Sequence, residues 1–312
     1  MGTTYSVVVS HPAEPLELDV IRQGVDSVLV TVNAAMSTYI PDSELSLLNQ
    51  SSSMDWQPVS KELMTVLEYA QQVGNLTGGA YDATVGPLVN LWGFGPGSQY
   101  DNTVPNDEQI ASAQARVGHD QLQLRGNPAA AKKLKEDLYV DLSSIAKGFG
   151  VDEVGRYLES QGLNEYLVEI GGEVRARGLS PRRDSWRVAV EKPEIGEVSV
   201  QRLLQLENIS VATSGDYKNY FERDGVRYSH TIDARTGRPV THRLASVSVA
   251  AASALEADAW ATALMVLGED AGYQLAQRLE LAAYFIYKSE SGFEILETRR
   301  FSELFGAEGT TG

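Results

Sequence analysis

The stretch Leu138-Tyr-Val-Asp-Leu-Ser-Ser-Ile-Ala-Lys-Gly-Phe-Gly-Val-Asp152 separates two halves of the chain that differ in pattern. Its first five residues form a short apolar run that predicts a strand. The two serines that follow can cap a helix that we expect to run to about Gln161. Lys147 and Gly148 fall in the first turn of this helix, where free N–H groups and the positive end of the helix dipole suit a phosphate. An ordinary strand–helix junction with a surface lysine explains the same residues.

Helices predominate before this stretch and strands after it. The first half has an expected strand at 5–9, expected helices at 16–36, 43–49, 60–74 and 107–117, and Gly-rich segments at 78–87 and 93–106. The second half has expected strands at 166–170, 186–190, 203–206, 210–212 and 245–250, helices at 254–267 and 271–279, and a hairpin of 281–287 with 293–298. Strands and helices mix without strict alternation, which predicts an α+β fold of mixed sheets with packed helices. Because no clean linker is present, we expect a single domain at 1–305 and a flexible tail at 306–312.

The composition is that of a globular and strongly acidic protein without cysteine. The 312 residues carry a formal net charge of −16 and are 43% hydrophobic. The acidity argues against a nucleic-acid partner, because no basic surface is available to neutralise phosphates. The lack of cysteine excludes disulfides, thiol nucleophiles and Cys-ligated metal centres. No run of 18 apolar residues predicts a transmembrane helix, and no signal peptide opens the chain, so we expect either a cytoplasmic protein or a trimmed mature one.

Two segments that contain glycine turns mark further candidate sites. The glycine pair in Val168-Glu-Ile-Gly-Gly-Glu173 follows a predicted strand, where a flat ligand can lie against the backbone or a simple bulge can occur. The segment Ser229-His-Thr-Ile-Asp-Ala-Arg-Thr-Gly237 places His230 between a strand-like stretch and a rigid turn. A neutral imidazole there can take a proton from a hydroxyl nucleophile, and a partly buried structural histidine fits the same pattern.

The small apolar segment Ala257-Asp-Ala-Trp-Ala-Thr262 predicts a buried helix that carries two polar groups. Asp258 and Thr262 are four residues apart and so share one face of that helix. A buried carboxylate and a buried hydroxyl need partners. One alternative is a hard cation such as Mg²⁺, which takes oxygen ligands and completes its shell with phosphates and water. The other alternative is a buried Arg or Lys that pairs with Asp258.

Six segments of the chain, in their order, resemble those of the ApbE-type FAD:protein FMN transferases. The segments that carry the resemblance are Met36-Ser-Thr-Tyr-Ile-Pro-Asp-Ser43, Gly79-Ala-Tyr-Asp-Ala-Thr-Val-Gly-Pro87, Asp141-Leu-Ser-Ser-Ile-Ala-Lys-Gly148, Glu169-Ile-Gly-Gly172, Ser229-His-Thr-Ile-Asp-Ala-Arg-Thr-Gly237 and Ala257-Asp-Ala-Trp-Ala-Thr262. Each is moderately specific, and together they cover nearly the whole chain. The resemblance implies an ApbE-like, T-fold-related architecture with a nucleotide site in the cleft between the two halves.

The resemblance also implies an Mg²⁺-dependent enzyme whose substrate is FAD. Such an enzyme would transfer FMN to a Ser or Thr hydroxyl of a target protein through a phosphoester bond and release AMP. Family members are typically periplasmic, and their targets are membrane-bound redox subunits. They often carry a lipid anchor on an N-terminal cysteine that precedes the region of resemblance. We therefore expect a periplasmic protein whose full-length form is an inner-membrane lipoprotein, attached through an anchor that this chain lacks.

The resemblance further assigns roles to individual residues of this chain. His230 would activate the incoming hydroxyl, and Asp258 would hold the metal on which the chemistry depends. The other metal ligands would be Thr262 and the carbonyl oxygen of Ala146. The residues expected to contact FAD are Met36, Tyr39, Tyr81, Asp82, Val85, Lys147, Glu169, Gly171, Gly172, Ser214, His230 and Ile232.

Two other functions fit the same residues. One is Mg²⁺-dependent hydrolysis of FAD to FMN and AMP, in which water replaces the protein hydroxyl. The other is a non-catalytic protein that binds or delivers FAD. Release of AMP from FAD alone would favour hydrolysis, whereas tight FAD binding without release of AMP would favour delivery.

Overall fold

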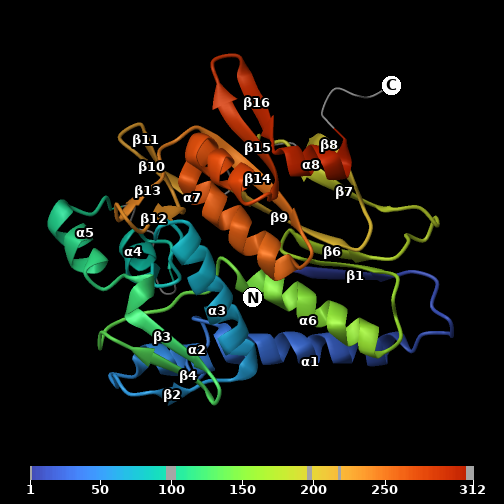
Figure 1. Cartoon of the computed structure of the whole chain (residues 1–312), viewed down its shortest axis with the longest axis horizontal. Coiled ribbons are helices and arrows are strands. Elements are labelled where there is room, and N and C mark those ends of the chain that lie inside the picture. The colour runs from blue at the N-terminus through green and yellow to red at the C-terminus, as the bar shows by residue number, and fades with distance from the viewer. Residues whose placement is uncertain (1, 96–102, 195–198, 217–218, 307–312) are drawn as a thin grey trace.

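A seven-stranded antiparallel sheet is the centre of the part of the chain that the structure describes (Figure 1). The computed structural model describes residues 2–95, 103–194, 199–216 and 219–306, so the predicted tail lies outside these ranges except for Gly306. In spatial order the strands are β1 (Tyr5–Val9), β5 (Tyr166–Ile170), β6 (Glu173–Arg177), β9 (Ile209–Gly215), β14 (Leu244–Ala251), β15 (Ala282–Ser289) and β16 (Gly292–Glu297). All neighbouring pairs are antiparallel. The predicted α+β fold is confirmed.

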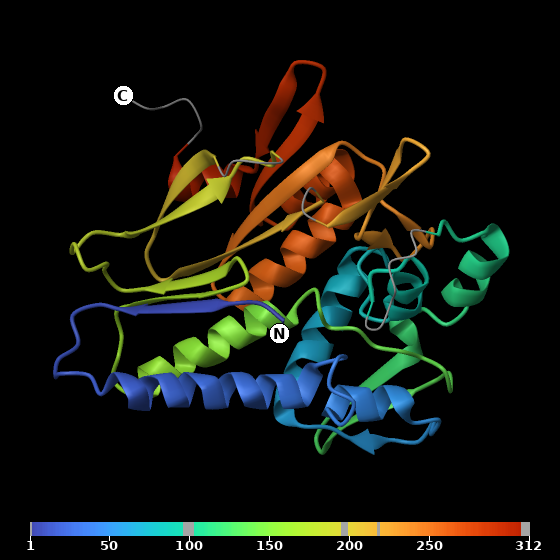
Figure 2. The ribbon, with the colours of Figure 1, turned by 180° about the vertical axis from the view of Figure 1, so that it is seen from behind.

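Helices α6 (Ala146–Ser160) and α7 (Ala254–Arg278) pack on one face of this sheet. The helices are α1 (Leu18–Met36), α2 (Glu44–Gln50), α3 (Lys61–Leu76), α4 (Gly86–Leu91), α5 (Asp107–Gln114), the 3₁₀ turn η1 (His119–Gln121), α6 (Ala146–Ser160), α7 (Ala254–Arg278) and α8 (Arg299–Phe305). Helix α6 lies between α1 and the sheet, as both views show (Figures 1 and 2). Buried residues of α1, α6 and β5 form one hydrophobic cluster, which holds the middle and the C-terminal part of α6 between α1 and β5.

Along strand β6, charged side chains lie on one face of the sheet and apolar side chains on the other. Side chains alternate along a strand, so Glu173 and Arg175 point to the helix face, where both form ion pairs with residues of α6. Val174 and Ala176 point to the opposite face. There they pack in a second cluster with α8 and with the hairpin of β7 (Trp186–Glu191) and β8 (Val200–Leu206).

Short strands complete the fold at the end of the molecule where α4 and α5 lie (Figure 2). They are β2 (Gln57–Pro58), β3 (Leu122–Gly126), β4 (Ala129–Lys133), β10 (Tyr220–Arg223), β11 (Val226–Ser229), β12 (Ile232–Asp233) and β13 (Arg238–Pro239). Strands β10 and β11 pack on α4 through stacked aromatic rings, in which Tyr228 contacts both Trp92 and Phe221. This contact holds the β11–β12 connection, and with it His230, beside α4.

The predicted strand at 138–142 is wrong. Leu138, Val140 and Leu142 are fully buried, as an apolar run should be, but they belong to no strand. The side chain of Asn49 bonds both the N–H and the carbonyl of Val140, and the N–H of Asp141 donates to the Ala83 carbonyl. These contacts satisfy backbone groups that a strand would satisfy through its neighbour.

Other differences from the predicted elements have local causes. The Gly-rich segment 78–87 was expected to lack regular structure, but α4 begins at Gly86. Pro87 stands at the start of this helix, where its missing N–H has no intrahelical partner to lose. The predicted serine cap of α6 is also wrong, because Ile145 is the N-cap residue and makes no side-chain cap bond. The helix expected at 107–117 ends at Gln114, and the sequence patterns did not indicate β2, β3, β4, β6, β10, β12, β13 or α8.

The helix pair expected at 254–267 and 271–279 is confirmed as one helix with a break. Gly268 has φ of 79° and ψ of 178° inside α7, a conformation that favours glycine. Within the described ranges, none of the helices combines the length and the apolar character needed to cross a bilayer.

Candidate active site

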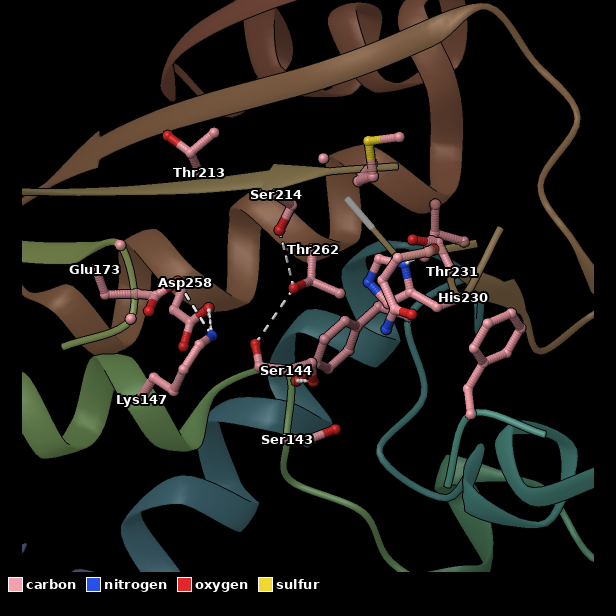
Figure 3. Close-up of a pocket in the computed structure, with 18 of the residues that line it drawn as sticks. Ser143, Ser144, Lys147, Glu173, Thr213, Ser214, His230, Thr231, Asp258 and Thr262 are labelled. Carbon is pink, nitrogen blue, oxygen red and sulfur yellow. Dashed lines mark hydrogen bonds and ion pairs between the residues drawn. The ribbon is translucent and has the colours of Figure 1, made fainter. Parts of the chain in front are cut away.

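A cavity of ≈ 690 Å³ lies where the β5–β6 turn and the end of β9 meet the start of α6 and one face of α7. Its volume is in the range typical of small-molecule sites. Residues from both halves of the chain line it, and Figure 3 shows the side chains at its centre. The predicted site residues on its wall are Tyr39, Tyr81, Asp82, Val85, Lys147, Glu169, Gly171, Gly172, Ser214, His230, Ile232, Asp258 and Thr262.

Two predicted site residues are not on this wall. Met36, at the end of α1, is only 4% exposed and packs in the largest hydrophobic cluster. The structure therefore assigns Met36 to the core rather than to direct contact with a ligand. Ala146 is the first residue of α6 and packs against the same cluster. Its proposed role as a carbonyl ligand stays a prediction.

Lys147 is the charged centre of the cavity (Figure 3). Its Nζ atom lies 3.1 Å from Oε1 of Glu173 and 3.7 Å from Oδ1 of Asp258. The other carboxylate oxygen of Asp258 accepts the N–H of Gly148 at 2.9 Å. A Cβ at Gly148 would lie 2.2 Å from the carbonyl oxygen of Ala254, so glycine is what allows α6 and α7 to approach this closely. Asp258 therefore has the lysine partner that one interpretation of the sequence anticipated.

Burial shifts the protonation of this cluster. Desolvation, with the nearby charge of Asp258, raises the pKa of Glu173 to about 8 despite the opposing effect of Lys147. Desolvation also raises the pKa of Asp258, although Lys147 and the Gly148 N–H act against it. Burial alone would lower the pKa of Lys147, but Asp258 and Glu173 outweigh burial and raise it. The lysine is therefore charged, whereas Glu173 becomes mostly ionised only above about pH 8.

A row of hydroxyl and carbonyl oxygens continues from this cluster across the cavity (Figure 3). The hydroxyl of Thr262 donates to the carbonyl oxygen of Ser144 at 3.3 Å and lies 3.2 Å from the hydroxyl of Ser214. The hydroxyl of Ser144 lies 3.0 Å from that of Tyr81. Helix α7 presents Thr262 one turn after Asp258, so the carboxylate and the hydroxyl share one face.

His230 lies at the opposite side of this row from Lys147 (Figure 3). Its Nδ1 atom is 2.9 Å from the carbonyl oxygen of Asn219, and the ring of Phe94 packs edge-on against it. A carbonyl only accepts hydrogen bonds, so Nδ1 carries the proton and Nε2 has the free lone pair. Burial lowers the pKa of His230, although the Asn219 carbonyl and Asp216 oppose this shift. The imidazole is therefore neutral and able to accept a proton at neutral pH.

Asp82 lines the cavity but its carboxylate is occupied by the protein. One oxygen accepts the N–H and the hydroxyl of Thr84, both at 2.7 Å, and the other accepts the N–H of His119 at 2.9 Å. These bonds tie the 80–85 loop to η1. The structure thus supports a part for Asp82 in shaping the wall through this loop.

The glycine pair forms a tight turn between β5 and β6. Gly171 and Gly172 have φ of +59° and +102°, and Ile170 pairs with Glu173 across the turn. Two positive φ values in a two-residue hairpin loop favour glycine, so the simple-bulge alternative is wrong. The N–H of Gly172 donates to Oε1 of Glu169 at 2.7 Å. A Cβ at Gly172 would meet nothing within 4 Å, which leaves its backbone open to a ligand.

The oxygen donors at the centre of the cavity fit a hard divalent cation. Asp258, the hydroxyl of Thr262 and the carbonyl of Ser144 supply the ligand types that Mg²⁺ takes. In the described part of the chain, no three His, Asp or Glu side chains are grouped so that they could bind a metal by themselves. A cation here would therefore depend on hydroxyl and carbonyl oxygens and on oxygens of a bound phosphate.

Several residues of the cavity wall were not predicted from the sequence. The most consequential is Glu173, which the Gly-Gly turn places beside Lys147. A signal was available, because Glu173 directly follows the glycine pair and alternation along β6 puts it on the face of Lys147. The others that contribute polar groups are Asp141, Ser143, Ser144, Glu191, Thr213, Asn219 and Thr231.

The structure defines an α+β protein with a polar cavity of the size of a small-molecule site, and comparisons with known proteins identify its family. The family model described as "ApbE family" matches residues 1–285. An FAD:protein FMN transferase of Vibrio cholerae is 47% identical over 294 residues, which cover 94% of this chain and 87% of that protein. An FAD:protein FMN transferase of Haemophilus influenzae is 42% identical over 309 residues, which cover 97% of this chain and 89% of that protein.

Solved structures give the same result. The flavin transferase ApbE of Vibrio cholerae matches with a TM-score of 0.90 at 44% identity, covering 98% of this chain and 96% of that one. The apo form of the Pseudomonas stutzeri flavinyl transferase ApbE matches with a TM-score of 0.90 at 39% identity, covering 98% of this chain and 95% of that one. The chain belongs to the ApbE family, and the resemblance inferred from its six segments is confirmed. As a member of this family the chain is a transferase.

Proposed function

We propose that the chain transfers FMN from FAD to a Ser or Thr hydroxyl of a protein acceptor and releases AMP. The observation that carries this proposal is a cavity whose wall holds a neutral imidazole, a charged lysine and a buried carboxylate. Relatives named FAD:protein FMN transferase, which match more than nine-tenths of the chain, support it.

The charge of the cavity supports dependence on Mg²⁺. Six carboxylates and one lysine are among the residues that line it: Asp82, Asp141, Glu169, Glu173, Glu191, Asp258 and Lys147. A pyrophosphate is repelled by such a wall unless a cation lies between them. Asp258, Thr262 and the Ser144 carbonyl would hold Mg²⁺, with the Ala146 carbonyl as the alternative backbone ligand. When bound, the cation neutralises charge on phosphate oxygens and on the departing AMP.

The residues of the chain then have separate tasks in the transfer. Lys147 holds the phosphates at the start of α6, and the open backbone of Gly172 accommodates the flavin portion. The acceptor oxygen attacks the phosphorus of the FMN moiety, and its proton passes to Nε2 of His230. The bond from that phosphorus to the bridging oxygen of the pyrophosphate breaks, and AMP leaves with the bridging oxygen. The product is a phosphoester between FMN and the acceptor.

The identity of the acceptor and its compartment are part of the proposal. We propose a membrane-bound redox subunit as the acceptor and a periplasmic location, as the resemblance to the family implies. Both are testable by fractionation of cells that express the full-length protein and by flavin detection in membrane proteins separated on a denaturing gel.

An assay of AMP release separates the proposed function from its two alternatives. Purified protein is incubated with FAD and Mg²⁺, with and without a candidate redox subunit. The proposal predicts AMP in amounts that match the acceptor present. Equal AMP release without acceptor would establish hydrolysis, and FAD binding without AMP release under either condition would establish delivery.

A further inference from the structure

Lys147 lies between two buried carboxylates and is closer to one of them (Figure 3). Its Nζ atom is 3.1 Å from Glu173 but 3.7 Å from Asp258. The three side chains come from three elements, α6, β6 and α7. Buried residues of β6 belong to one cluster of the core, and those of α6 and α7 share two others. All three side chains therefore extend from packed helices or strands rather than from a loop.

Burial of Glu173 is unfavourable unless the residue has a compensating partner. Its side chain is 4% exposed, and its Oε2 atom is buried and makes no hydrogen bond within the described residues. A buried carboxylate with an unsatisfied oxygen destabilises a fold unless a cation offsets its charge. Lys147 is a cation within ion-pair distance. Glu173 therefore acts on the cavity chiefly through this lysine.

An ammonium group and a divalent cation compete for the same carboxylate. If Glu173 had no charge, Lys147 would be drawn to Asp258, its other anionic partner in this cluster. We propose that Glu173 is a positioning residue that holds the ammonium group of Lys147 back from Asp258 and so leaves Asp258 available to the metal. This inference rests on the metal site of the proposed function and adds to it a residue that the sequence motifs did not single out.

Binding of Mn²⁺ in the absence of FAD tests this role without any assay of activity. The electron paramagnetic resonance signal of free Mn²⁺ reports the dissociation constant. The measurement is made at about pH 8.5, because Glu173, whose pKa burial raises to about 8, is mostly ionised there. Glu173→Gln keeps the shape of the side chain and removes this charge, and we expect it to raise the dissociation constant roughly tenfold or more. Adding Lys147→Met removes the competing ammonium group, and the double variant should return to within about threefold of the wild type.

A matched control separates this effect from the total charge of the cavity. Glu169 lines the same wall, but its Oε1 accepts the N–H of Gly172. Glu169→Gln removes the same charge from the wall, and its dissociation constant should stay within about threefold of the wild type. Thermal melting of each variant in the same buffer checks that it is folded. If Glu173→Gln does not fold, Lys147→Met is measured by itself. This variant should bind Mn²⁺ at least as tightly as the wild type.

Four results would overturn the proposal. They are unchanged binding by Glu173→Gln, equal weakening by Glu169→Gln, a double variant as weak as Glu173→Gln, and weaker binding by Lys147→Met. Each of these leaves the metal site itself in place. If the wild type shows no saturable Mn²⁺ binding, or if Asp258→Asn binds as well as the wild type, the metal site of the proposed function is also wrong.

Discussion

His230 owes its proposed reactivity to its surroundings. The Asn219 carbonyl fixes the proton on Nδ1, and burial favours the neutral ring. Groups that face the ring from other elements are Asp216, whose charge opposes the shift, and Lys147, whose charge adds to it. A base of this kind is usable at lower pH than an exposed histidine with a pKa of about 6.5.

The pH dependence of transfer should follow from this lowered pKa. Because the active form of His230 is the neutral one, the rate should rise with pH, and the midpoint of that rise should lie below about 6.5. In His230→Ala the rising limb should vanish, with a loss of roughly 10²–10⁴ in rate. FAD affinity, measured by flavin fluorescence, should remain within about tenfold of the wild type. Parallel losses of affinity and rate would instead make His230 a flavin contact.

Replacement of Asp258 should abolish FMN transfer without unfolding the protein. Asp258→Asn can still accept the Gly148 N–H, but it no longer supplies an anionic ligand to a cation. We expect transfer below about 1% of wild type, the scale of loss when one electrostatic stabiliser is removed. Chelation of the wild type with EDTA should have the same effect, and added Mg²⁺ should reverse it. Wild-type activity in the variant or in EDTA would place the metal elsewhere or exclude it.

Residue types could be predicted from the sequence, whereas several contacts could not. Asp258, Thr262 and Lys147 were predicted from local patterns, and the structure brings all three to one cavity. Glu173 was not predicted as a site residue because its role depends on an ion pair with Lys147, which is distant in sequence. Met36 was misplaced because the segment that follows it faces the cavity at Tyr39 while Met36 itself faces the core.

At the scale of elements, the close contact of α6 and α7 aligns Lys147 with Asp258. A Cβ at Gly148 would lie 2.2 Å from the Ala254 carbonyl oxygen and 2.8 Å from Cβ of Asp258. The first of these atoms is backbone, so the helices would have to move apart. The position of the carboxylate therefore depends on a glycine in the neighbouring helix.

Gly148→Ala should lower both stability and transfer. Overpacking of a tight interface typically costs about 1–3 kcal/mol, although alanine has the higher helix propensity. The free energy of unfolding from denaturant titration should fall by about this amount, and the transfer rate should fall because Asp258 is displaced. A variant as stable and as active as the wild type would show that the α6–α7 spacing is not critical.

Periodic elements were predicted well and irregular ones were not. Helices α1, α3 and α6 have apolar faces at helical spacing, and the break in α7 at Gly268 lies between the two helices predicted at 254–267 and 271–279. The run at 138–142 has strand composition, yet its backbone bonds go to the side chain of Asn49 and to Ala83. Such pairing is set by tertiary contacts that no local pattern records.

At the scale of the whole molecule, the largest hydrophobic cluster joins the two halves of the chain. Val66 and Leu142 from the first half pack in it with Ala212 and Phe285 from the second. Because neither half can bury these residues alone, we propose that residues 1–305 fold as a single domain.

This proposal predicts one cooperative unfolding transition. Trp92, Trp186 and Trp260 belong to three different hydrophobic clusters, so their combined fluorescence reports on most of the molecule. Denaturant curves from tryptophan fluorescence and from far-ultraviolet circular dichroism should coincide within error. Two separated transitions would indicate that the halves are independent domains.

The intact mass of the acceptor shows whether this cavity transfers FMN to a protein hydroxyl. A candidate redox subunit is incubated with the enzyme, FAD and Mg²⁺, beside a subunit whose acceptor Ser or Thr is replaced by Ala. We predict that the unaltered subunit gains the mass of one FMN phosphoester, that the altered one gains none, and that Asp258→Asn enzyme modifies neither. An unchanged mass of the unaltered subunit, in a reaction where FAD is consumed and AMP appears, would show that the enzyme hydrolyses FAD and does not transfer FMN to this subunit.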